Sequence, residues 1–320
     1  MEHQKPNTEE QTVGWERAVL EKLAFAAIDE QKKARRWGVF FKSITFAYLA
    51  IVLAMVIYPN FEAEIGVQSQ HTAVIDVLGM IAEGEPANAD SIIEGLRDAL
   101  KDKNTKGVIL NINSPGGSAV QSAYVFEEIR RQKVKHPDMP IYSVVGDMCA
   151  SGGYYIASAS DKIYVSQASI IGSIGVIMNG FGFTHVMEKL GVERRLLTAG
   201  THKAMLDPFS PENQQESKHM QTLLDQVHQQ FITAVKLGRG DRLKETPEMF
   251  SGLVWTGEQG VNLGLADGFG SVDSVARDII GTDETVNFTQ NERLIDRLAG
   301  KFGASFAHAI GTAIKSIDLQ

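Results

Sequence analysis

The sequence predicts an α/β protein with a mostly parallel sheet, preceded by a single membrane-spanning helix. Two observations predict this fold class. From residue 71 onward, short runs rich in Val and Ile alternate with amphipathic stretches in the order β, α, β, α, β, α, β, and such alternation builds a parallel or mixed sheet covered by helices. Upstream, residues 38–58 are apolar with Lys42 as their only charge, and about 20 apolar residues suffice to cross a bilayer.

The apolar run predicts an uncleaved membrane anchor with a cytoplasmic N-terminus. A buried core helix is the alternative, but such helices rarely run this long without a polar face. A basic cluster at 32–36 precedes the run, whereas Glu62 and Glu64 follow it, and an excess of Lys and Arg marks the cytoplasmic side. We expect a cytoplasmic segment at 1–36, an anchor in the lipid bilayer of the inner (cytoplasmic) membrane at 37–58, a connection at 59–70 and a periplasmic or otherwise extracytoplasmic domain at 71–281.

Within that domain, the elements can be placed in order from their patterns. Strands are predicted at 72–78, 107–112, 141–145 and 163–165, with helices at 89–101, 119–131 and 154–160. Apolar positions at helical spacing predict a long helix over 211–237, which Gly238 and Gly240 end. The C-terminal segment, 282–320, is expected to add a strand and an amphipathic helix that packs on the domain or on a neighbouring copy.

Composition excludes several classes of protein. The chain is 43% hydrophobic and 22% charged, as in ordinary globular proteins. Its 31 basic and 39 acidic residues give a net charge of −8, which argues against a nucleic-acid partner. The single cysteine, Cys149, can close no intramolecular disulfide. His219 and His228 on the long helix lack the spacing of a zinc site, so we predict no metal and expect both at the surface or near a cap.

Two glycine-rich loops follow predicted strands, at the ends where α/β sheets place their sites. The amides of the first loop, 114–118, can converge on an anion or a developing oxyanion, or the loop is only a tight turn. It matches neither a Walker nor a dinucleotide motif. In the second loop, Ser151 precedes an expected helix, either as a nucleophile beside the amide of Gly152 or as an N-cap. Its surroundings are not a G-x-S-x-G elbow.

Between residues 107 and 270 five motifs occur in order: NINSPGGS, GDMCASGGYYIASASDKIYV, GSIGVIMNG, LLTAGTHKAMLDPFSP and SGLVWTGEQGVNLGLADGFGS. In these residues the sequence resembles the signal peptide peptidase A family of membrane-bound serine peptidases. The resemblance implies a ClpP/crotonase-type fold, a Ser-Lys dyad, no cofactor and an oligomer open toward the membrane. It implies Ser151 as nucleophile and Lys203 as general base. Ser173 would hydrogen-bond that lysine, and the amide of Gly117 would bind the oxyanion.

The proposed base must meet one chemical condition. A lysine amine is protonated at neutral pH and accepts no proton until its surroundings desolvate it. The neighbours of Lys203 are partly apolar, but His202 is polar and lies next to it. A Ser-His-Asp arrangement of Ser151, His202 and Asp147 is therefore an alternative, although adjacent positions in a chain do not specify the orientation that a triad needs.

The motif set occurs once in this chain, whereas larger family members carry two fused copies. The resemblance therefore implies a homo-oligomer in which Ser151 of one subunit meets Lys203 of the next. Family members hold peptides as added strands beside the sheet, and Tyr154 and Met178 are candidate substrate contacts.

The predicted function is a membrane-anchored serine endopeptidase. It would hydrolyse membrane-derived peptides, such as remnant signal peptides, through an acyl-enzyme. Two other functions stay open from the sequence. A crotonase-like acyl-CoA enzyme would use loop amides to stabilise a thioester enolate, and a non-catalytic membrane scaffold would use neither dyad residue.

Overall fold

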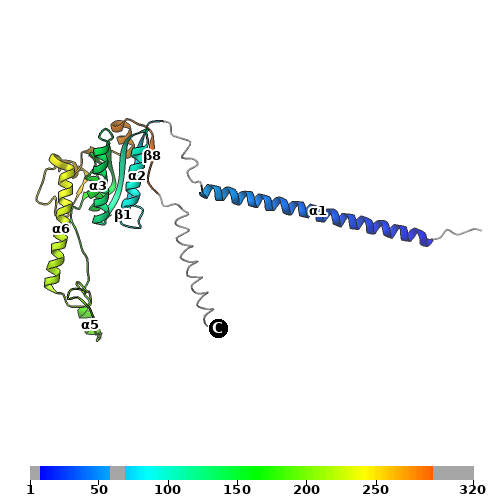
Figure 1. Ribbon diagram of the computed structural model, residues 1–320, viewed down its shortest axis with the longest axis horizontal. Coiled ribbons are helices and arrows are strands. Elements are labelled where there is room, and N and C mark those ends of the chain that lie inside the picture. Colours follow the sequence, from blue (N-terminus) through cyan, green and yellow to red (C-terminus); the bar gives the residue numbers. More distant parts are fainter. Residues whose placement is uncertain (1–7, 58–68, 291–320) are drawn as a thin grey trace, which may run out of the picture. The chain divides into compact units, whose positions relative to one another are not determined.

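The computed structural model describes residues 8–57 and 69–290. They belong to two compact units, of which the second covers Val67–Glu292. The described part of the first unit is one helix, α1 (Thr8–Ile57) (Figure 1). Among the residues whose side chains are described, no helix offers an apolar stretch long enough to cross a bilayer. Part of the predicted anchor, at position 52 and at 54–58, lies outside those residues.

Residues 69–290 build an eight-stranded sheet in the order β6-β5-β3-β2-β1-β8, with β4 pairing to β3 and β7. Every pair is parallel except β5 with β6. The predicted α/β class is thus confirmed, and the sheet is mixed. Its strands are β1 (His71–Ile81), β2 (Thr105–Gly117), β3 (Ile141–Ala150), β4 (Lys162–Val165), β5 (Ile170–Gly172), β6 (Val254–Thr256), β7 (Gly268–Phe269) and β8 (Thr285–Asn287).

Two helices, α2 (Ala89–Lys101) and α3 (Ala119–Lys135), lie side by side over the sheet (Figure 1). Each begins at a side-chain cap: Asn88 accepts from the Ser91 amide at 2.9 Å, and Ser118 accepts from the Gln121 amide at 3.3 Å. Such caps satisfy amides that lack a partner within the helix. The main core forms between these helices and the strands. It includes Ile75, Ile92, Leu96, Leu110, Ile112, Val125, Ile129 and Ile141.

A second, smaller core covers part of the sheet. It joins Ile109, Val144 and Tyr164 from the strands to Val275 and Ala276. The last two belong to α8 (Val272–Val275) and the π-helical turn η2 (Ala276–Ile280). Burial of both sheet faces explains why the central strands read as nearly continuous apolar runs rather than as alternating patterns.

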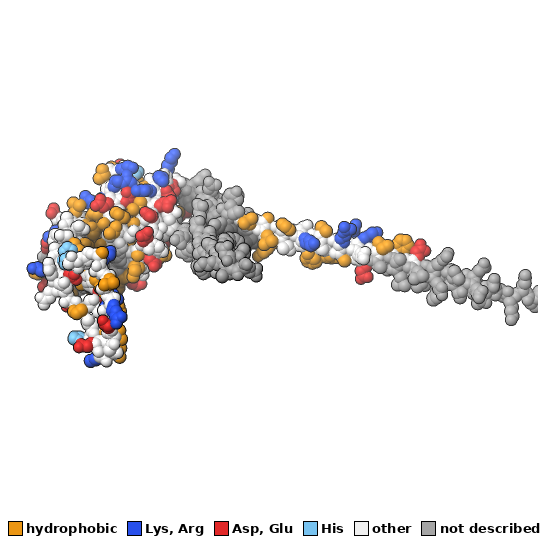
Figure 2. All heavy atoms as spheres, turned by 60° about the horizontal axis from the view of Figure 1, so that its bottom comes forward, with side chains coloured by type: hydrophobic (Ala, Val, Ile, Leu, Met, Phe, Trp, Pro, Cys, Tyr) orange, Lys and Arg blue, Asp and Glu red, His pale blue; other side chains and the backbone are white. Residues whose placement is uncertain are grey.

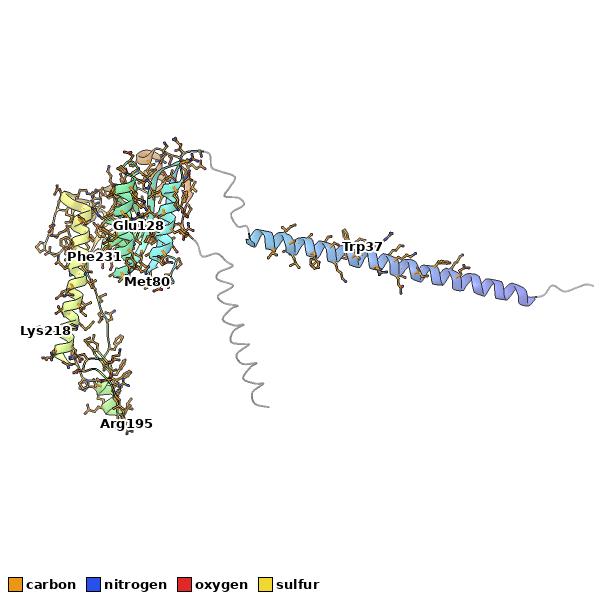
Figure 3. All side chains as sticks on the ribbon, viewed as in Figure 1. Trp37, Met80, Glu128, Arg195, Lys218 and Phe231 are labelled. Carbon is orange, nitrogen blue, oxygen red and sulfur yellow. The ribbon has the colours of Figure 1, made fainter. Side chains whose placement is uncertain are left out.

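The long helix α6 (Gln214–Arg239) is buried only toward its C-terminal end, at Phe231, Ala234, Val235 and Arg239. Together with α5 (Thr184–Leu190) and the connecting loops, its N-terminal part extends away from the sheet (Figure 1). Figure 3 shows Phe231 beside the sheet and Lys218 and Arg195 far from it. We call residues 176–227 the arm. No residue of α5 is buried within the chain.

Arg239 fixes the buried end of α6. Its guanidinium donates to Asp267 at 2.7 Å and to the Gly264 carbonyl at 2.9 and 3.0 Å. Asp267 also accepts from the Ile163 amide of β4 at 2.7 Å. A buried charge held by a partner and by hydrogen bonds is the form in which proteins tolerate such groups. These contacts attach the C-terminal end of α6 to the sheet, and the arm extends from the other end of the helix.

The remaining elements are short or lie outside the description. The predicted helix at 154–160 is α4 (Gly152–Ala157), which begins earlier and ends earlier than expected. The 3₁₀ turn η1 (Gly240–Arg242) and α7 (Gly257–Asn262) complete the set. The predicted amphipathic helix near the C-terminus, from residue 291 onward, and nearly all of the connection at 59–70 lie outside the described residues.

Candidate active site

Ser151 lies where β3 ends and α4 begins. Its backbone has φ 50° and ψ −120°, a region that disfavours any residue with a β-carbon and that is often found at functional sites. Its amide donates to the Gly172 carbonyl of β5 at 2.8 Å, which holds the strained conformation. Ser151 occupies the N-cap position of α4, yet its side chain makes no capping hydrogen bond. Its hydroxyl is therefore not used as a helix cap.

The glycines of the first loop pack directly against this turn. A β-carbon on Gly116 would come within 2.7 Å of the Ser151 β-carbon and of the Gly152 nitrogen. A β-carbon on Gly152 would lie 3.2 Å from the Gly117 nitrogen. Both Gly116 and Gly117 also have positive φ, 102° and 152°. The loop thus needs glycine for close approach as well as for conformation.

This packing gathers two backbone amides next to Ser151. The Gly152 nitrogen belongs to the first turn of α4, where an amide has no acceptor within the helix. The Gly117 nitrogen lies next to Gly152, 3.2 Å from the position that a β-carbon on Gly152 would take. Two such amides beside a serine can stabilise an oxyanion that forms when the serine attacks a carbonyl carbon.

Ser173 is a second serine whose backbone lies close to that of Ser151. The pairing of β3 with β5 sets Ala150 opposite Gly172, so Ser151 and Ser173 each follow one member of the same pair. Ser173 also has a positive φ, 52°, and its amide donates to the Leu253 carbonyl at 2.8 Å. Apart from Leu206 these are the non-glycine residues with positive φ among those described. The structure brings Ser151 and Ser173 together.

Lys203 lies elsewhere in the same chain. It belongs to the loop between α5 and α6, in the arm, and its side chain is exposed. Its amide donates to the Gly200 carbonyl at 3.2 Å. Within the described part of the chain, no hydrogen bond or ion pair joins its amine to another side chain, and none joins it to Ser151 or Ser173. One chain alone does not assemble the Ser-Lys pair.

Comparisons with known proteins identify the family. The sequence profile of peptidase family S49 matches residues 133–281. A protein named putative signal peptide peptidase SppA, from Enterococcus faecium, is 33% identical over 241 residues, which cover 72% of this chain and 70% of that protein. The chain belongs to the signal peptide peptidase A family of S49 peptidases.

Two other relatives are much longer than the region that matches this chain. Proteins named Na(+)/H(+) antiporter NhaA, from Brucella abortus and Brucella melitensis, are 42% and 41% identical over 198 residues. These residues are 62% of this chain but only 27% of each antiporter-named protein. The chain thus spans about a quarter of the length of these two relatives.

The residues of the alternative triad are not gathered in this S49 peptidase chain. His202 hydrogen-bonds through its Nδ1 to Glu216 at 2.9 Å, within the arm. Asp147 accepts from the Asn113 side chain at 3.1 Å. No described contact links either residue to Ser151. A Ser-His-Asp arrangement inside one chain is therefore not formed.

The two candidate substrate contacts have different surroundings. Tyr154 is 0% exposed, and its hydroxyl donates to the Leu265 carbonyl at 2.8 Å. Burial raises the pKa of that hydroxyl. The expectation that Tyr154 lines a substrate pocket is corrected accordingly: its side chain is part of the core, because α4 turns this face toward the sheet. Met178, by contrast, is exposed at the start of the arm.

Cys149 and His228 complete the surroundings. Cys149 is fully buried, and burial raises the pKa of its thiol, as expected for a small core residue rather than a second nucleophile. His228 is half-buried, and its Nε2 lies 3.0 Å from the Ile174 carbonyl. Its spacing from Leu224 and Phe231 on one helix face was the signal that could have placed it there.

Proposed function

We propose that this S49 peptidase is a membrane-anchored endopeptidase in which Ser151 is the nucleophile and Lys203 of a neighbouring copy is the general base. The observation that carries the proposal is the strained turn at Ser151, which leaves the hydroxyl free of any capping role and lies against the Gly116-Gly117 loop. Non-glycine residues are held in such conformations mainly where function requires it.

The reaction follows from these groups. The Ser151 oxygen attacks the peptide carbonyl carbon while its proton passes to the neutral Lys203 amine. The amides of Gly117 and Gly152 stabilise the oxyanion. The resulting ammonium then protonates the departing amine, leaving an acyl-enzyme, and the same lysine activates the water that hydrolyses it. Because only the neutral amine accepts a proton, kcat/KM should rise toward alkaline pH.

A neighbouring copy accounts for two features of the arm. Among residues 8–57 and 69–290, no side chain pairs with the Lys203 amine, and Lys203 is exposed, whereas a catalytic lysine needs a desolvated site. The arm also exposes large apolar side chains, among them Leu197 at 99%. Burial of such a surface against a second copy would be favourable. The exposed apolar residues of the arm include Ile177, Phe181, Val186, Leu190, Val192 and Leu197.

The substrate class follows from the surface near the Gly117 loop. Met80 and Ile81 of β1 pair with Gly116 and Gly117 of β2, while β8 pairs with β1 only near Thr72–Val74. Along this part of β1, an extended peptide could add as a strand. Apolar side chains are exposed there and at the start of α3: Leu78, Met80, Val120 and Tyr124. This surface favours apolar peptides, such as remnant signal peptides. Figure 3 shows Met80 at the lower end of the domain.

Membrane attachment is the part of the proposal that concerns α1. The apolar residues of 37–58 would span the bilayer, with the N-terminus inside the cell. At the start of this run, Trp37, Phe40 and Phe41 form an aromatic cluster with ring centroids 5.7 to 5.9 Å apart. Basic and apolar side chains adjoin along this helix (Figure 2). Aromatic and basic residues at one end of an apolar run are typical of a membrane interface.

Covalent labelling tests the proposed nucleophile. A fluorophosphonate, which reacts with activated serines, should modify Ser151 in the full-length protein, and mass spectrometry of peptides should place the adduct on that residue. Ser151→Ala should not be labelled, whereas Ser158→Ala, which changes the serine at the C-cap of α4, should be labelled as the unchanged protein is. Absence of an adduct at Ser151 would contradict the proposal and favour an acyl-CoA enzyme or a scaffold.

The pH dependence tests the proposed base. If the base is Lys203, the alkaline rise in kcat/KM should persist in His202→Ala. A rise near the usual titration range of histidine, lost in His202→Ala, would assign the base to His202 instead.

A further inference from the structure

The backbone that follows Ser173 turns sharply. Ser173 has φ 52°, and its carbonyl accepts from the Gly175 amide at 2.9 Å, which is the hydrogen bond of a three-residue γ-turn centred on Ile174. The Ile174 side chain is fully buried. The turn uses the Ser173 carbonyl and leaves the Ile174 carbonyl to find its partner elsewhere.

That partner is a side chain of α6. Nε2 of His228 lies 3.0 Å from the Ile174 carbonyl oxygen. Because a carbonyl oxygen only accepts, Nε2 carries the hydrogen. The neutral tautomer protonated at Nε2 and the imidazolium ion both offer it.

Three hydrogen bonds within the described part of the chain thus hold residues 173–175. The Ser173 amide donates to Leu253, the Gly175 amide donates to Ser173, and His228 donates to Ile174. Two of them join backbone to backbone. The third comes from the His228 side chain. Its loss would leave the carbonyl oxygen of the buried residue Ile174 without this donor.

His228 also lies at a boundary of α6. Three residues further along the helix, Phe231 enters the core, followed by Ala234 and Val235. On the other side of His228 the helix leads into the arm, where Lys218 projects far from the sheet (Figure 3). The His228 side chain therefore links the turn after Ser173 to the part of α6 from which the arm extends.

We propose that His228 is a positioning residue that holds the Ser173 hydroxyl in place for the catalytic lysine. The inference rests on the proposed function, because it takes Ser173 as the hydrogen-bonding partner of the Lys203 amine of a neighbouring copy. Without the His228 bond, the peptide group between Ile174 and Gly175 keeps the γ-turn hydrogen bond of its amide but loses the one on its carbonyl, so it can rotate more readily. Since Ser173 is already in a strained conformation, such a rotation would shift its hydroxyl and change the protonation of the lysine that it contacts.

The test compares kcat/KM as a function of pH for full-length variants of known melting temperature. His228→Leu removes the donor, and its kcat/KM should fall roughly fivefold, as for the loss of about one hydrogen bond. Its alkaline limb should be displaced as in Ser173→Ala. His228→Gln keeps an amide donor on a side chain of similar reach and should restore both. Gln230→Leu, an exposed position on the same helix, should change neither.

A double variant sharpens the result. If His228 acts through Ser173, the variant with both Ser173→Ala and His228→Leu should show the same displaced limb as Ser173→Ala alone. A lowered melting temperature in His228→Leu with an unmoved limb would overturn the proposal and leave His228 a structural role. If His228→Leu does not fold, His228→Asn, whose amide is too short to reach Ile174, replaces it with the same expectations. Undiminished activity of Ser151→Ala, assayed in parallel, would instead contradict the proposed function.

Discussion

The amide of Ser151 donates to the carbonyl of Gly172 at 2.8 Å, and Ser173 follows directly on Gly172. Both serines have a positive φ, 50° and 52°. The parallel pairing of β3 with β5 therefore fixes two strained serines next to each other. Since these contacts lie inside one chain, a single copy is enough to place the two serines next to each other.

Two replacements of Ser151 distinguish its backbone strain from its catalytic role. Ser151→Ala should fold normally and lose hydrolysis of apolar peptides by several orders of magnitude, because the nucleophilic oxygen is absent. Ser151→Gly should be equally inactive, yet more stable than Ser151→Ala by about 1 kcal/mol, since glycine adopts positive φ without strain. Urea unfolding of both variants measures the difference. Equal stabilities would show that the turn is not strained.

Gly116 should tolerate no side chain. In Gly116→Ala the new β-carbon would collide with Ser151 and Gly152, so kcat should fall at least about 10²-fold, as for misplaced catalytic groups. Gly84 is the matched control, because it also has positive φ, 81°, but has open space around it. Gly84→Ala should lose about 1 kcal/mol of stability and keep its activity. Similar activities of the two variants would contradict the role of this packing.

Acid should destabilise the helical layer through Glu128. A hydrogen bond from Arg131, aided by Arg97 and Gln132, holds the pKa of the Glu128 carboxyl well below its usual value. A carboxyl with a lowered pKa in the folded state stabilises the protein above its unfolded-state pKa of about 4.3, and this contribution is lost as pH falls below it. The free energy of unfolding should therefore drop below about pH 4, and less steeply in Glu128→Gln. Parallel pH dependences would rule out this contribution.

Membrane topology can be tested in spheroplasts. If α1 contains the anchor with its N-terminus inside, added protease should digest the domain beyond residue 70 and spare a fragment that includes residues 1–36. Digestion of the domain only after lysis would reverse the proposed localisation.

The sequence patterns were sufficient for much of the fold. The alternation of Val- and Ile-rich runs with amphipathic stretches predicted the β1–β3 strands and α2 and α3, because local periodicity follows burial. The antiparallel pairing of β6 with β5 was not predictable, since it joins segments more than 80 residues apart in the sequence and depends on tertiary packing.

In the candidate site, too, local features could be predicted from the sequence and tertiary contacts could not. The glycine loops and Ser151 follow strands, so their positions could be expected from the sequence. Tyr154 was assigned to a pocket but lies in the core, because the short helix α4 turns it inward. The hydrogen bond from His228 to the Ile174 carbonyl could not be predicted, because it depends on the three-dimensional path of the chain after Ser173.

Mixed oligomers provide the most direct test of the central claim, that Ser151 and Lys203 act from neighbouring copies. Ser151→Ala and Lys203→Ala should each be inactive alone. When the two are co-expressed with different affinity tags and the mixed assemblies are isolated by both tags, some interfaces will combine an intact serine with an intact lysine, and part of the activity should return. Assemblies of Ser151→Ala with a Ser151→Ala, Lys203→Ala double variant should stay inactive. Doubly purified Ser151→Ala and Lys203→Ala mixtures without activity would contradict the shared site.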